Sequence, residues 1–141
     1  MSTNSNSVKA YTKRVGSRWN TDDATVVTAV SVPIRPGHVI MLTLGITAYN
    51  ITTNTSMAAT KIAAYQQTPA GVISLLGALV DVYQAGGAWP VTLVIVQPTP
   101  GVEGRVDIKV AGVAAQNISW QVAVDILEGG PHAANTGWTN G

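Results

Sequence analysis

Residues 39–49 read VIMLTLGITAY, and an apolar side chain recurs at every second position through the segment. Successive side chains of a strand point to opposite faces, so a period of two predicts a half-buried β-strand. One face of this strand would carry five apolar side chains: Ile40, Leu42, Leu44, Ile46 and Ala48. The chain is therefore expected to build its core from strands.

Six other segments are also typical of strands, and short runs rich in glycine, proline or polar residues separate them. They are residues 25–34, 57–67, 72–84, 91–96, 106–111 and 118–126. The alanine content of 57–67 would also allow a short helix, and 72–84 predicts one or two strands that pivot near Gly77. The mainly apolar run 91–96 predicts a buried strand.

Short strands at this spacing are typical of all-β domains with two packed layers. We expect a single-domain antiparallel β-sandwich or jelly roll of about eight strands over residues 21–128. A flexible arm at residues 1–20 would precede it, and a flexible tail at residues 129–141 would follow it. A chain of 141 residues suits one domain, and its lack of cysteine excludes disulfides and thiolate metal sites.

The chain is poor in charge. Charged residues make up 11% of the sequence, against about 25% in an average soluble domain. Because charge is depleted at the centres of protein interfaces, this composition favours a chain that hides part of its surface in an assembly. A surface of Thr, Ser, Asn and Gln is the other interpretation, since such a surface also dissolves well.

The first 20 residues concentrate the positive charge. They carry Lys9, Lys13, Arg14 and Arg18 and no acid, whereas the rest of the chain carries four bases and seven acids, a net −3. The arm has no periodic apolar face, so we expect it to become ordered only on a partner. Its cations, with Tyr11 and Trp19 among them, could contact an acidic protein surface or nucleic acid phosphates, or remain solvated. The acidic body argues against nucleic acid as the main partner.

The sequence has no recognisable export or membrane segment. The opening residues MSTNSNS are polar, and no apolar stretch follows them. No apolar run reaches the ~18 residues that a membrane-spanning helix needs. We therefore expect the chain to stay in a cytoplasm-like compartment, without a membrane partner.

Recognisable catalytic motifs are absent. The sequence has no nucleophile elbow, phosphate-binding loop or dinucleotide fingerprint. His38 and His132 are isolated and no cysteine accompanies them, so a zinc site is not expected. Asp22–Asp23 is expected to be a loop feature, because a calcium site needs several carboxylates close together.

Four acids near the end of the body could form a paired-carboxylate glycosidase site if the last two strands pair. These are Glu103, Asp107, Asp125 and Glu128. Asp107 and Asp125 alternate with core positions, so both are expected to point outward and be solvated. We accordingly expect no enzyme activity, no cofactor and no metal.

The last two predicted strands carry a recognisable pattern. Residues 104–114 read GRVDIKVAGVA and residues 117–124 read NISWQVAV, with Glu128 closing the second strand. Trp120 lies on the apolar face of that strand and is expected to anchor the core. The pattern resembles a closing motif of small β-sandwich virion proteins of tailed bacteriophages, namely capsid decoration (cement) proteins and the end domains of head fibres and tail fibres. The resemblance covers roughly residues 21–128.

This resemblance implies a structural or adhesive virion protein, commonly a homotrimer, that is assembled in the host cytoplasm. The leading hypothesis is a capsid decoration protein that binds the major capsid protein or another virion protein, because 141 residues leave no room for a fibre shaft. Docking is assigned to the two ends of the chain. The expected docking residues are Lys9, Tyr11, Lys13, Arg14, Arg18, Trp19 and Trp138. On this view, deleting residues 1–18 would leave the body folded and abolish docking.

The alternative is a receptor- or glycan-binding module at a fibre tip. Such a module needs exposed aromatic side chains that can stack on sugars. Tyr83 and Trp89, on either side of Gly86–Gly87, are the candidates.

Overall fold

The computed structural model describes residues 11–130, and this part of the chain consists of strands and the turns that join them. Eight antiparallel strands form two sheets, which confirms the predicted all-β class. The strands are β1 (Tyr11–Thr21), β2 (Val26–Pro33), β3 (Val39–Asn50), β4 (Thr55–Gln67), β5 (Ile73–Gly86), β6 (Val91–Val96), β7 (Arg105–Ala111) and β8 (Ile118–Gly129). Residues 11–130 include no helix that could span a membrane.

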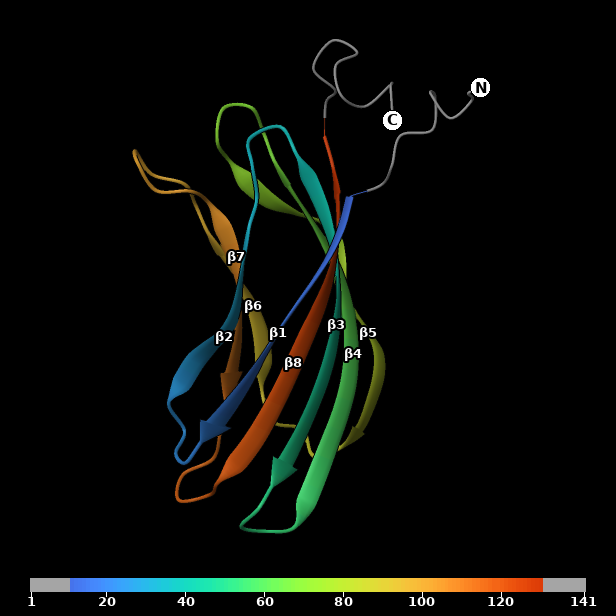
Figure 1. Cartoon of the computed structure of the whole chain (residues 1–141), viewed down its shortest axis with the longest axis vertical. Helices are drawn as coiled ribbons and strands as arrows, with labels where there is room; N and C mark the ends of the chain where they lie inside the picture. Colours follow the sequence, from blue (N-terminus) through green and yellow to red (C-terminus); the bar gives the residue numbers. More distant parts are fainter. Residues whose placement is uncertain (1–10, 131–141) are drawn as a thin grey trace.

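The larger sheet has five strands in the order β1-β8-β3-β4-β5, and the smaller sheet has three in the order β2-β7-β6. Figure 1 shows the two sheets beside each other, with most strands running along the long axis of the molecule. β3, the strand predicted from residues 39–49, pairs without interruption with β8 on one side and β4 on the other. This register places Leu42 between Ile126 and Ala63, so the apolar faces of the three strands coincide.

One buried apolar cluster contains side chains from both sheets. Trp120 of β8 is fully buried, and its indole Nε1–H donates to Thr21 Oγ1 at 3.0 Å. Its ring packs edge-on against that of Trp89, with the ring centroids 6.4 Å apart. The smaller sheet contributes Val106 and Ile108, which are also fully buried. The largest fully buried side chain among the described residues thus lies where strands from both sheets converge, and its buried apolar area stabilises the packing of the two sheets.

Residues 11–21 form β1, so the expectation of a flexible arm is wrong for residues 11–20. β1 pairs with β8 along its whole length, from Tyr11 opposite Glu128 to Thr21 opposite Ile118. Backbone hydrogen bonds to β8 hold this edge strand, and they do not require a periodic apolar face. Residues 1–10 of the predicted arm and residues 131–141 of the predicted tail, including Lys9 and Trp138, lie outside the described residues.

Two further predictions concern whole strands. Residues 57–67 lie in β4, a strand and not the helix that the alanines would also allow. β6 is the edge strand of the smaller sheet, with β7 as its only neighbour, and Val94 is 39% exposed. The prediction of a buried strand at 91–96 is therefore wrong, because an apolar run alone does not distinguish a central strand from an edge strand.

Asp107 lies on the face of β7 opposite the core residues Val106 and Ile108, as the alternation predicts, but it is buried, so the expectation that it is solvated is wrong. It lies on β7 directly opposite Ser31 of β2 and Val94 of β6. Its Oδ1 accepts a hydrogen bond from Ser31 Oγ at 2.7 Å and another from Arg105 Nε at 3.0 Å. A carboxylate with two donors can be buried without a large penalty.

Candidate functional site

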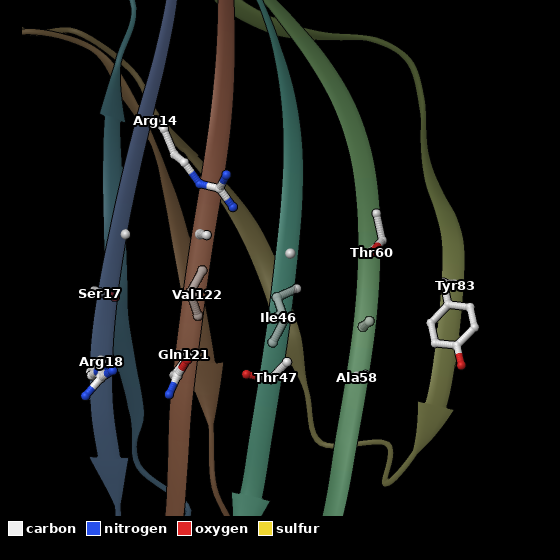
Figure 2. Close-up of a pocket in the computed structure, with 14 residues that line it drawn as sticks. Arg14, Ser17, Arg18, Ile46, Thr47, Ala58, Thr60, Tyr83, Gln121 and Val122 are labelled. Atoms are coloured by element: carbon white, nitrogen blue, oxygen red, sulfur yellow. The ribbon is translucent and has the colours of Figure 1, made fainter.

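An open groove crosses the outer face of the larger sheet, the face turned away from the buried cluster. Its volume is about 720 Å³, and residues of all five strands line it. Figure 2 shows Arg14, Ser17 and Arg18 of β1 on one side, and Tyr83 of β5 on the other. The groove is larger than two other hollows on the same sheet, of about 420 and 350 Å³.

The floor of the groove is low because the strand register aligns small residues. Gly16 of β1, Ala123 of β8 and Gly45 of β3 lie side by side in one row, which continues to Thr60 of β4 and Tyr83 of β5. A Cβ atom added at Gly45 would meet no other atom within 4 Å. The groove is therefore a consequence of which small residues the register brings together, and a larger side chain at Gly45 would fill it.

Two arginines form the wall on the β1 side. Arg14 Nε lies 3.6 Å from Asp125 Oδ1, and both side chains are mostly exposed, so this ion pair stabilises little. Arg18 has no carboxylate oxygen within 4.0 Å among the described residues. Both guanidinium groups thus remain available to a ligand, and their planar forks match carboxylates well.

The rest of the lining is neutral and can form hydrogen bonds. Thr47, Thr60 and Gln121 contribute hydroxyl and amide groups. Tyr83, which is 58% exposed, offers a ring face and a phenol. A surface of this kind can bind an extended acidic segment or a polar ligand with carboxylate, hydroxyl or phosphate groups.

The alternation of β1 divides the predicted docking residues between two faces. Arg14 and Arg18 lie on the outer face, in rows with Asp125 and Gln121. Lys13 pairs with Ile126 of the core-facing set, so it belongs to the opposite face. Trp19 lies on that opposite face too, and its Nε1–H donates to the Ala29 carbonyl of β2 at 3.4 Å. Two of the predicted docking residues, Arg14 and Arg18, therefore line the groove. Tyr11 is the first residue of the same strand.

The two aromatic residues that the sugar-binding alternative relies on differ in their environment. Trp89 is half-buried and packs against Trp120, so it is less open to stacking than Tyr83, which is 58% exposed. Tyr83 lines the groove. Tyr83 is therefore the stronger candidate for the sugar hypothesis.

Comparisons of this chain with protein-family models, with curated proteins and with solved structures gave no match. A functional proposal therefore depends on the surfaces of the chain itself.

Several of the acids that the sequence singled out have partners of their own. Arg35 donates to Glu128 Oε2 from Nε at 3.1 Å and from Nη2 at 2.9 Å, and His38 Nε2 lies 3.9 Å from the same oxygen. The backbone N–H of Thr25 donates to Asp23 Oδ1 at 2.8 Å and lowers the pKa of that carboxyl, as in a loop turn. Within residues 11–130, no group of three or more His, Cys, Asp or Glu side chains could hold a metal ion.

Tyr65 also has a shifted pKa. Its phenol lies in the buried cluster, and burial raises its pKa because the phenolate would lose its hydration there. It is a core residue and does not contribute to the groove.

Sequence reasoning missed most of the groove. Gly45, Thr47, Thr60 and Gln121 occupy outward positions of alternating strands, but only the register across all five strands shows that they share a surface. The one signal in the sequence was the run of small and polar residues at alternate positions of 39–49.

Proposed function

We propose that this protein is a structural protein of a bacteriophage virion, without enzyme activity, that decorates the assembled capsid shell. The observation that carries the proposal is the groove wall of Arg14 and Arg18, two exposed cations on a chain with few charges. Apart from Tyr83, the groove lining offers none of the side chains that commonly act as general acids or bases. Such a surface favours binding over catalysis.

The proposed partner is an acidic segment of the major capsid protein or of another virion protein. The groove would hold this segment in extended form, with its carboxylates on the two arginines. A ligand that binds only the assembled shell stabilises that state by mass action. The protein would then be part of the virion, which it would join while the virion assembles in the host cytoplasm. It would act as a homotrimer.

We also propose that the two sheets form a β-sandwich related to the jelly roll. The nested pairing of β1 with β8 and of β2 with β7 supports this, because a jelly roll wraps both ends of the chain around its middle. β3, β4 and β5 pair consecutively, as in a meander. The fold would therefore be a variant in which a meander extends one sheet.

The double variant Arg14→Ala/Arg18→Ala is expected to weaken shell binding at least about tenfold, or about 1.4 kcal/mol. Both side chains are exposed, so their loss should leave the free energy of unfolding unchanged. Binding is measured by co-sedimentation of the full chain with purified shells over a range of salt concentrations. Wild-type binding should weaken with salt more steeply than binding of the double variant, since salt screens exposed charges.

Two comparisons isolate the groove. Lys13→Ala removes one charge from the same strand on the opposite face and should bind like the wild type. Gly45→Val fills the groove floor without touching a charge and should bind as weakly as the double variant. Unchanged affinity of the double variant, or equal weakening by Lys13→Ala, would show that the groove is not the docking site.

Tyr83 on the groove wall supports a second candidate function, the recognition of a surface sugar. If this is the activity, Tyr83→Ala should abolish binding on a glycan array, because a ring face provides the stacking surface for a sugar. Tyr49→Ala is the matched control, since Tyr49 is an exposed tyrosine of the same sheet outside the groove. No binding of the wild type to any glycan would reject this alternative.

A further inference from the structure

Strand β5 carries a cluster of exposed apolar side chains. It is an edge strand of the larger sheet, and the apolar residues at its centre are between 38% and 56% exposed. We call these residues the β5 patch: Leu75, Leu76, Leu79, Val80 and Val82. Large apolar side chains concentrated on one strand mark an interaction surface, whereas isolated ones need no explanation.

The β5 patch occupies both faces of its strand. Leu76 pairs with Ala64, in the row of the outer face that continues through Met41 to Leu127. Leu75 pairs with Tyr65, whose side chain belongs to the buried cluster, so it lies on the inner side. The apolar surface therefore wraps around the edge of the sheet, beyond what the smaller sheet covers.

The two edges of the larger sheet differ in how they are protected. β1 carries three cations, Lys13, Arg14 and Arg18, and charges on an edge strand discourage unwanted association. The only charged residue of β5 is Asp81, and Lys61 Nζ pairs with it. The β5 patch thus lacks the charges that natural sequences place on an edge that must stay free.

Irregular pairing interrupts the free edge of β5. The register with β4 shifts twice, and at one shift Gly77 adopts a φ of 71°. Bulges of this kind disfavour the addition of another strand to the edge. What covers the β5 patch must therefore pack against its side chains and not extend the hydrogen-bonded ladder.

We propose that the β5 patch, with Met41 and Leu127, is the surface through which this chain associates with a second copy of itself. Together these side chains expose roughly 600 Å² of mainly apolar area, at the upper limit for one patch on a monomer. A standard interface buries about 800 Å² per partner, so a modest polar rim would complete it. The net charge of +1 leaves little repulsion between copies.

This inference deepens the proposed homo-oligomeric virion protein and rests on it for the biological setting. The β5 patch adjoins the groove: the row of Leu76 and Met41 lies two rows along the strands from that of Gly45, and the row of Val80, which ends at Arg14, lies between them. Docking to a shell and association between copies would then use neighbouring parts of the same sheet.

The test is the solution mass of the full chain, measured by light scattering over a range of concentrations. The wild type should have a multiple of the 14.6 kDa chain mass. Leu76→Asp/Val80→Asp should be monomeric, with the far-UV circular dichroism of the wild type. Val102→Asp is the matched control, because Val102 is 50% exposed against 52% for Val80 and lies outside the patch; it should associate like the wild type.

A second variant controls for the possibility that aspartate disturbs folding and not only association. Leu76→Thr/Val80→Thr keeps residues that favour strands and should raise the dissociation constant at least about tenfold. A monomeric wild type, or unchanged mass in both patch variants, would overturn the inference.

Shell binding of the same samples separates the two proposals. An oligomer that patch substitutions dissociate, but that ignores shells, would uphold the β5 patch and reject the virion role. A wild-type monomer that decorates shells would do the reverse.

Discussion

Replacing Trp120 with alanine is expected to lower the free energy of unfolding by about 3–5 kcal/mol. The side chain is fully buried, it packs against Trp89, and its Nε1–H is bonded to Thr21. The substitution leaves a cavity between strands of both sheets and an unpaired hydroxyl at Thr21. Urea denaturation followed by circular dichroism measures the loss, and the slope of the transition shows whether unfolding remains two-state.

Trp19→Ala is the matched control for Trp120→Ala. Trp19 is 41% exposed, and its hydrogen bond to Ala29 is long, at 3.4 Å. Its removal should therefore cost about 1 kcal/mol or less. Similar losses for the two variants, or a loss below about 1 kcal/mol for Trp120→Ala, would mean that Trp120 does not anchor the core.

Deletion of residues 1–18 is expected to destabilise the fold severely, which reverses the expectation drawn from the sequence. The deletion removes most of β1, which pairs with β8 through eleven residue positions. The edge of β8, which carries the core residue Val124, would then be open along most of its length, and an open apolar edge promotes aggregation. We expect a loss of cooperative unfolding and aggregation on size-exclusion chromatography.

The comparison for this deletion is the removal of residues 1–10, which takes away no residue of β1. The shorter deletion should keep the cooperative transition. A cooperative, monodisperse chain lacking residues 1–18, as stable as one lacking residues 1–10, would show that β1 is dispensable for folding. Docking by the arm must accordingly be tested with single substitutions on β1 and not with the longer deletion.

The strands that the sequence predicted well are those with a buried face. In β3, five core residues alternate without exception, and the predicted bounds of 39–49 differ from Val39–Asn50 by one residue. The closing strand around Trp120 is similar, with Val122 and Val124 continuing the pattern. Here the local pattern and the tertiary environment agree, because each strand is central in its sheet.

The edge strands β1 and β6 were not predicted correctly from the sequence pattern. Among the described side chains of β1, Val15 is the one hydrophobic residue that packs against the cluster, and Trp19 is half-exposed, so the sequence looks like a solvated arm. β6 is mainly apolar and half-exposed. An edge strand is stabilised by backbone hydrogen bonds to one neighbouring strand. The hydrophobic periodicity of a sequence does not indicate those hydrogen bonds.

Features that depend on distant partners could not be predicted from local patterns. Asp107 is buried because Ser31, 76 positions away in sequence, supplies a donor. The groove exists because Gly16, Ala123 and Gly45 align across three strands. Arg14 and Arg18 were recognised as docking residues from their charge, but only the register separates them from Lys13 and Trp19 on the other face.

The most direct test of the proposed role is co-sedimentation of the full-length wild-type protein with purified, expanded capsid shells, titrated to saturation at several salt concentrations. The account predicts saturable binding with a fixed number of copies per shell, weakened by salt because exposed arginines contribute to it. Protein that stays in the supernatant at every concentration, including low salt, would contradict the proposed virion role.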